Sequence, residues 1–149
     1  MIPPTVHFIQ PSQQITNKGD YSMGFKEAII TVLNNYANFS GRARRSEYWY
    51  FVLFTSIVTG VLSILGGNPE NGRNIFTILS SLFSIAIFIP NLAVIWRRLH
   101  DIGKSGLNYF WILLPLIGWI MLLVWLARDS MPGENMYGPN PKETYYYTE

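Results

Sequence analysis

The stretch IFTILSSLFSIAIFIPNLAVIWRRLHD, residues 75–101, is a long uncharged run that ends in a dense group of charges. The uncharged run begins at Asn74 and continues for 23 residues to Trp96. A helix rises about 1.5 Å per residue and the hydrocarbon core of a bilayer is about 30 Å thick, so roughly 20 residues can cross it. This run therefore predicts a membrane-spanning helix.

Two further uncharged runs flank the first, one of 22 residues over 48–69 and one of 23 residues over 105–127. Only 13% of the 149 residues are charged, against about 25% in an average soluble domain. A soluble bundle of buried helices is the alternative, but three successive helices without a charge are unusual there. The sequence predicts an all-α integral membrane protein with three transmembrane helices, at about 48–65, 75–96 and 107–127.

The rest of the chain is more polar. Phe25, Ile29, Leu33 and Tyr36 recur at helical spacing and predict an amphipathic helix over 23–38, either lying on the bilayer or packed against the end of the bundle. Residues 1–22 are expected to be a flexible extension and residues 128–149 a polar tail rich in Pro and Gly. Residues 23–142 would form a single membrane domain.

The distribution of Lys and Arg predicts the orientation. With three crossings, the N-terminal segment and the loop after the second span share one side and hold eight of the eleven Lys and Arg residues. The positive-inside rule then places the N-terminus in the cytoplasm and the tail outside. Pro115 and Gly118 leave open a re-entrant hairpin in the third segment, which would return the tail to the cytoplasm. We expect one crossing here.

Charged residues border the first two spans. Glu47 lies in the first turn of the first span, where the helix dipole favours an acid, and Arg97 and Arg98 lie at the end of the second, where it favours cations. These two helix ends lie on the same membrane face. An ion pair between Glu47 and Arg97 or Arg98 would hold the two spans together.

Binding is the functional interpretation of the same charges. Guanidinium groups match phosphate geometry with paired hydrogen bonds, and basic pockets between spans can bind lipid headgroups. We expect the cytoplasmic face to bind an anionic lipid headgroup, or a partner membrane protein or second copy, through six cations: Arg42, Arg44, Arg45, Arg97, Arg98 and Lys104.

Other function classes find less support. His100 and Asp101 suggest a base and its orienting acid in a membrane enzyme acting on a phosphate-bearing lipid, but adjacent helix positions point about 100° apart. The chain has no cysteine and two histidines, so we predict no metal site and no cofactor. A net charge of +2 gives no reason to expect nucleic acid. Uncharged spans disfavour a transporter or channel subunit.

Four motifs in order resemble one bacterial membrane-protein family, domain of unknown function 805 (DUF805). They are GRARRSEYW (residues 41–49), RRLHDIGKSG (97–106), PLIGW (115–119) and PGENMYGPNP (132–141). The resemblance implies a small multi-span helical protein of the bacterial cytoplasmic membrane, and it implies that the tail motif belongs to the core design. It brings no established activity. We expect a non-enzymatic membrane protein.

Overall fold

The computed structural model describes residues 16–17, 23–67, 74–143 and 145–146. Apart from Thr16 and Asn17, the predicted extension over 1–22 lies outside these residues. The elements, in chain order, are β1 (Thr16–Asn17), α1 (Phe25–Asn34), α2 (Arg45–Gly66), α3 (Ile75–Asp101), the 3₁₀-helix η2 (Gly106–Leu113), α4 (Ile117–Ala127) and β2 (Tyr145–Tyr146).

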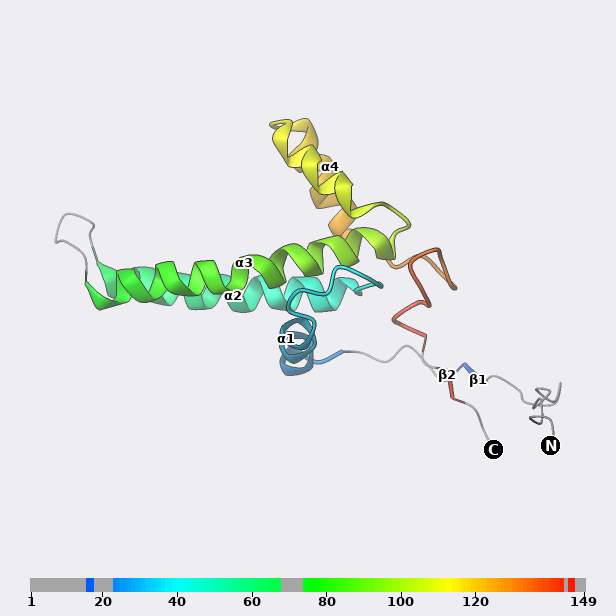
Figure 1. Cartoon of the computed structure of the whole chain (residues 1–149), viewed down its shortest axis with the longest axis horizontal. Coiled ribbons are helices and arrows are strands. Elements are labelled where there is room, and N and C mark those ends of the chain that lie inside the picture. The colour runs from blue at the N-terminus through cyan, green and yellow to red at the C-terminus, as the bar shows by residue number, and fades with distance from the viewer. Residues whose placement is uncertain (1–15, 18–22, 68–73, 144, 147–149) are drawn as a thin grey trace, which may run out of the picture.

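Helices α2 and α3 form a long antiparallel pair (Figure 1). Each starts where the sequence supplies an N-terminal signal: Glu47 lies in the first turn of α2, and the Asn74 side chain accepts a hydrogen bond from the Thr77 amide at the start of α3. Gly67, with φ of 65°, ends α2, and Gly103, with φ of 73°, follows α3. Both helices are long and apolar enough to cross a membrane.

The outer surfaces of the pair are apolar as well as exposed. Ile64 is 80% exposed, and Leu82 and Phe88 also present more than half of their surface. Only 17% of the most apolar window of each helix is buried within the protein. A soluble core helix would be mostly buried, so these faces suit the hydrocarbon of a bilayer.

Helix α1 runs across the pair rather than along it, and Figure 1 looks nearly down its axis. Its buried side is formed by Ala28 and Val32, and Val32 belongs to the small core that also contains Phe51 and Val94. Ile30 and Leu33 remain exposed. If α2 and α3 cross the bilayer, α1 lies roughly in the membrane plane, as an interfacial helix does.

The structure corrects the third predicted span, because residues 107–127 do not form one helix. The chain rises as η2, turns at 114–116 and returns as α4, which has 11 residues. Pro115 has no amide hydrogen for a continuous helix, and Leu116 takes a left-handed φ of 64°. Gly118 permits the close return, since a Cβ there would lie 1.7 Å from the Trp111 carbonyl oxygen.

This hairpin brings the tail back to the end of α3. The Met131 amide donates to the Asp101 carbonyl at 3.1 Å, and β2 pairs antiparallel with β1, so residues 145–146 meet residues 16–17. The start of α2, the end of α3 and the tail therefore lie together. We call this region the basic end. The prediction that the tail lies across the membrane from the N-terminal segment is thus wrong for this structure.

Candidate anion site at the basic end

The basic end contains buried charges held in two groups. Arg42, Arg44, Arg97 and Arg98 are each at most 8% exposed, and Glu47 and Asp101 are buried with them. Burying an ion costs several kcal/mol unless partners compensate it. How each guanidinium is compensated therefore decides what it can do.

The first group, which we call the Asp101 cluster, consists of Arg42, Arg98 and Asp101. Arg42 Nε donates to one carboxylate oxygen of Asp101 at 3.0 Å, and Arg98 Nη1 donates to the other at 2.6 Å. Arg98 and Asp101 are fully buried. Because they are three positions apart on α3, the helix itself places them side by side.

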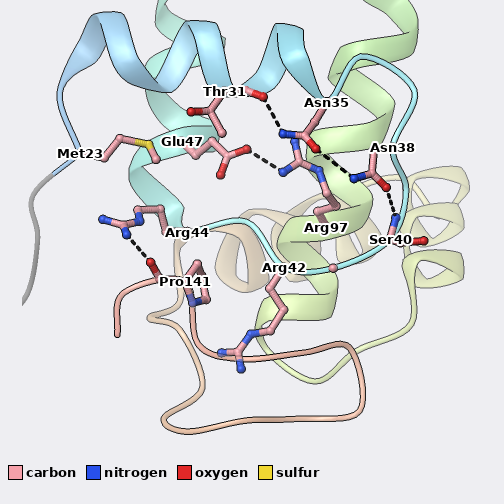
Figure 2. Close-up of a pocket in the computed structure, with 11 residues that line it drawn as sticks. Met23, Thr31, Asn35, Asn38, Ser40, Arg42, Arg44, Glu47, Arg97 and Pro141 are labelled. Atoms are coloured by element: carbon pink, nitrogen blue, oxygen red, sulfur yellow. Dashed lines mark hydrogen bonds and ion pairs between the residues drawn. The ribbon is translucent and has the colours of Figure 1, made fainter. Parts of the chain in front are cut away.

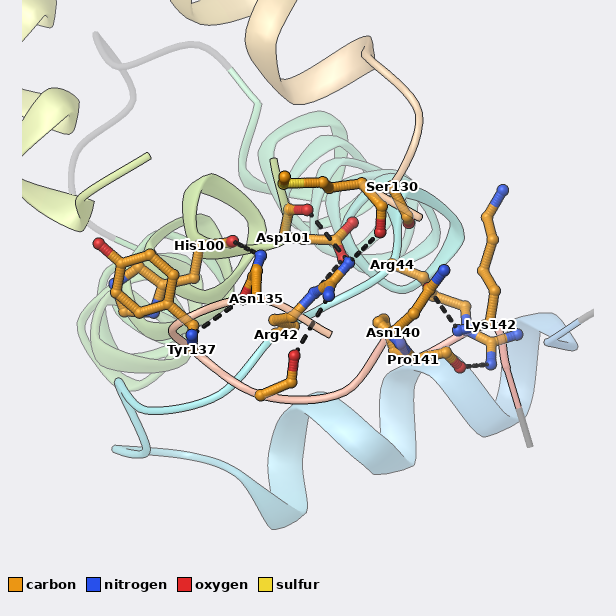
Figure 3. A network of polar contacts seen from close by, with 12 residues as sticks. Arg42, Arg44, His100, Asp101, Ser130, Asn135, Tyr137, Asn140, Pro141 and Lys142 are labelled. Atoms are coloured by element: carbon orange, nitrogen blue, oxygen red, sulfur yellow. Dashed lines mark hydrogen bonds and ion pairs between the residues drawn. The ribbon is translucent and has the colours of Figure 1, made fainter. Parts of the chain in front are cut away.

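Backbone carbonyls occupy the remaining donors of this cluster. Arg42 Nη1 donates to the Gly133 carbonyl at 2.7 Å, and Nη2 donates to the Met131 carbonyl at 2.5 Å. Arg98 Nε donates to the Leu126 carbonyl at 3.2 Å and Nη2 to that of Arg128. Every nitrogen of both guanidinium groups thus has an acceptor. Figure 3 shows Arg42 enclosed in this way beside Asp101.

His100 lies at the edge of the same cluster. Its ring stacks on Tyr137 with centroids 3.8 Å apart and planes 2° from parallel, and its Nδ1 lies 3.1 Å from the Gly41 carbonyl oxygen. The Asp101 carboxylate faces Arg42 and Arg98. The structure therefore does not bring His100 and Asp101 together as a base and its orienting acid.

The second group lines a cavity of about 340 Å³, which we call the Arg97 pocket. Arg97 Nη1 donates to Glu47 Oε1 at 2.8 Å, which joins α3 to α2. Arg98, the other partner considered for Glu47, pairs with Asp101 instead. Arg44 borders the pocket and donates from Nη2 to the Pro141 carbonyl of the tail (Figure 2).

Arg97 differs from its neighbours in its unused donors. Its Nε and Nη2 atoms are buried, and neither donates to any acceptor within residues 23–67 and 74–143. An unsatisfied buried donor costs about 1–3 kcal/mol, and more when the group is charged. The side chain is held in place by its ion pair and its helix, with one edge of the guanidinium unsatisfied by the protein.

The opposite wall of the pocket is polar. Asn35 Nδ2 donates to the Thr31 carbonyl at 2.9 Å, Asn38 Nδ2 donates to Asn35 Oδ1 at 2.9 Å, and the Ser40 amide donates to Asn38 Oδ1 at 3.0 Å. These bonds tie the end of α1 to the loop that leads to Arg42. Figure 2 shows the side chain of Asn35 beside that of Arg97.

The other predicted cations lie outside both groups. The side chain of Arg45 is 53% exposed and its Nε lies 4.0 Å from Asp129. Lys104 Nζ lies 4.4 Å from the centroid of the Trp125 ring. Across the part of the chain that the structure describes, no three acidic, Cys or His side chains are grouped as metal ligands.

Sequence reasoning missed two features of the site. One is the role of Asp101, for which the three-residue spacing to Arg98 was an available signal. The other is the polar wall formed by Asn35, Asn38 and Ser40, for which the sequence offered no signal beyond its three polar residues. The tail carbonyls that accept from Arg42, Arg44 and Arg98 were also outside its reach, because backbone groups have no residue signature.

Comparison with known proteins identifies the family. The family model described as a protein of unknown function (DUF805) matches residues 36–139, which contain both arginine groups. This chain belongs to the DUF805 family. It is 42% identical over 117 residues to the inner membrane protein YhaH of Escherichia coli (strain K12), covering 76% of this chain and 94% of that protein.

A second relative supports the same placement. Inner membrane protein YhaI of the same strain is 42% identical over 113 residues, covering 76% of this chain and 93% of the relative. No solved structure matches this DUF805 chain. The chain is thus a small inner-membrane protein of unknown function, and its two long apolar helices are the candidate spans.

Proposed function

We propose that this DUF805 protein binds the anionic headgroup of a membrane lipid in the Arg97 pocket. The observation that carries the proposal is the pair of buried Arg97 donors, Nε and Nη2, without an acceptor in the described residues. A cavity of about 340 Å³ adjoins this side chain, a volume within the usual range for small-molecule sites. An anion there would satisfy donors that the fold leaves unused.

The charge balance points the same way. Arg42, Arg97 and Arg98 are compensated by only two buried carboxylates, those of Glu47 and Asp101. One positive charge therefore remains in excess among these five groups. Because uncompensated buried charge is costly, a bound anion would stabilise the basic end.

The surroundings of the pocket favour a lipid as the source of this anion. The pocket lies at the end of the α2–α3 pair, and α1, which runs across the pair, supplies Thr31 to its lining. In a bilayer this places the pocket near the headgroups. The Nε and Nη2 atoms lie below the pocket surface, so a headgroup oxygen reaches them only when a bordering side chain such as Asn35 moves aside.

The distribution of charge supports a cytoplasmic position for the basic end. With the tail returned by the hairpin, ten of the eleven Lys and Arg residues belong to segments on this side. Arg73 alone belongs to the segment joining α2 to α3. The positive-inside rule then places both the N-terminal segment and the tail in the cytoplasm.

Native mass spectrometry of the full chain, extracted with its lipids and then exchanged into defined anionic lipid, tests the proposal. Arg97→Lys keeps the charge beside Glu47 but removes the two-donor edge of the guanidinium. We expect at least about a 10-fold loss of retained lipid, since hydrogen bonds to charged groups contribute about 1.5–3 kcal/mol.

Arg45→Lys is the matched control, because Arg45 is exposed and lies outside the pocket. It should retain lipid as the unaltered protein does. Equal retention by both variants would overturn the proposal. Thermal unfolding of each variant in the same detergent distinguishes a lost ligand from a lost fold.

A further inference from the structure

We infer that the ligand of the Arg97 pocket is a phosphodiester monoanion whose headgroup carries a hydroxyl, of the phosphatidylglycerol type. The inference rests on the proposed lipid-binding function and adds the chemistry that selects the headgroup. It combines three observations: the free edge of Arg97, the second oxygen of Glu47 and the size of the charge excess.

The unused donors of Arg97 lie on one edge of the guanidinium. Nη1 is engaged by Glu47 at 2.8 Å, and the donors without an acceptor are Nε and Nη2. In a planar guanidinium the Nε–H and one Nη2–H are nearly parallel, a fork that matches two oxygens of one phosphate or carboxylate. A ligand with two oxygens on one phosphorus would satisfy both donors together.

Glu47 adds a requirement of the opposite kind. Its Oε1 accepts from Arg97, and no donor from the described residues is recorded for its Oε2. Figure 2 shows this second oxygen turned away from Arg97 on the pocket side. An ionised carboxylate only accepts hydrogen bonds, so the matching ligand group is a donor. A headgroup hydroxyl beside the phosphate meets this need.

The charge excess sets the ionisation of the ligand. The five paired groups leave one positive charge, which one phosphodiester neutralises. A phosphomonoester approaches two negative charges near neutral pH and would bring an extra charge close to Glu47. The site therefore favours a diester over a monoester.

The test uses the unaltered protein in lipid nanodiscs, with two lipids of matched charge. Phosphatidylglycerol and phosphatidylmethanol are both monoanionic diesters with the same acyl chains, and only the first has headgroup hydroxyls. We expect phosphatidylglycerol to be retained at least about 10-fold more strongly in native mass spectra. Phosphatidic acid, a monoester, should also be retained less than phosphatidylglycerol.

The outcomes separate the two proposals. Equal retention of phosphatidylglycerol and phosphatidylmethanol, with both lost in Arg97→Lys, would overturn the headgroup inference and leave lipid binding intact. Retention of neither lipid would overturn both proposals. Stronger retention of phosphatidic acid than of phosphatidylglycerol would also contradict the inference.

Two additions assign the effect to Glu47 and to a lipid. Glu47→Gln keeps the side-chain shape but removes the carboxylate, so the preference for phosphatidylglycerol should fall toward parity. The lipid comparison itself does not depend on the folding of this variant. Soluble glycerophosphoglycerol should displace the bound lipid only weakly, and efficient displacement would show that a free phosphodiester is the ligand.

Discussion

The Asp101 cluster and the Arg97 pocket place similar residues at the same end of the molecule in different ways. In the cluster, Arg42 and Arg98 share one carboxylate, and backbone carbonyls accept their other hydrogen bonds. In the pocket, Arg97 pairs with Glu47 and leaves two donors unused among the described residues. The first arrangement joins segments of the protein, and the second leaves guanidinium chemistry for a ligand.

The largest expected effect concerns the side on which the tail lies, because the cluster requires the tail beside Arg42. The chain has no cysteine, so single introduced cysteines report position without background. Lys26→Cys and Met136→Cys, both at exposed positions, should be labelled by a membrane-impermeant maleimide from the same side of sealed vesicles. Asn71→Cys, between α2 and α3, should be labelled only from the other side.

Labelling of Lys26→Cys and Met136→Cys from opposite faces would mean that the third segment crosses the bilayer. The carbonyls of Met131 and Gly133 could then not reach Arg42, and the contrast between cluster and pocket would disappear. The outcome is complete labelling or none, which makes this the sharpest test of the hairpin.

Removing the shared acid should destabilise the protein more than any other single change. Asp101→Asn leaves Arg42 and Arg98 buried without a counter-charge, and breaking a buried pair in this way costs about 3–5 kcal/mol. The unfolding free energy in detergent, followed by tryptophan fluorescence, measures the loss. Asp129→Asn is the control, because its side chain is 60% exposed and should cost at most about 1 kcal/mol.

If Asp101→Asn were as stable as Asp129→Asn, backbone carbonyls alone would suffice to hold the two guanidinium groups. The cluster would then resemble the pocket energetically, with the carboxylate contributing little.

A smaller loss is expected when the hairpin is strained. In Gly118→Ala the new Cβ meets the Trp111 carbonyl oxygen, with 1.7 Å between them in the unrelaxed position. Relief by backbone movement should cost about 1–3 kcal/mol and should displace the Leu126 and Arg128 carbonyls that accept from Arg98. Thermal unfolding in detergent measures this loss.

Gly60→Ala is the matched substitution, because nothing lies within 4 Å of the added Cβ on α2. Alanine there should be neutral or stabilising, by up to about 1 kcal/mol. Equal destabilisation by both substitutions would contradict the close return of α4 against η2.

The sequence predicted the long helices well because their signal is local. Uncharged runs longer than a bilayer needs can hardly be read otherwise, and α2 and α3 occupy two of them. The third run has the same composition, so counting apolar residues could not distinguish one crossing from η2 followed by α4. Pro115 and Gly118 held that information, but its meaning depends on the left-handed turn at Leu116 and on the approach of Trp111.

The candidate site could be predicted only in part, for a similar reason. Residue types identified the arginines and an ion pair of Glu47 with one of two neighbours. Which neighbour pairs with Glu47 depends on how α3 is rotated, and Arg97 rather than Arg98 faces α2. The division into a saturated cluster and an open pocket depends on carbonyls of the tail, whose positions follow from the hairpin.

The smallest effect concerns the exposed edge of the basic end. A hydrogen bond from Lys142 lowers the pKa of Asp129 below its ordinary value. A lowered carboxylate pKa contributes stability that is present above the unfolded pKa and is lost as the pH falls through the folded one. Near neutral pH, Lys142→Gln should therefore lower the unfolding free energy by about 0.2–1 kcal/mol.

The same comparison at about pH 3, below the unfolded aspartate pKa of about 3.9, should give a smaller difference between Lys142→Gln and the unaltered protein. High salt should also reduce the difference near neutral pH, because the Asp129 side chain is 60% exposed. A loss that persists at low pH and high salt would mean that Lys142 supports the tail by packing. The edge of the basic end would then be held by the same kind of contact as its interior, and the difference between screened surface pairs and the saturated Asp101 cluster would not extend to the tail.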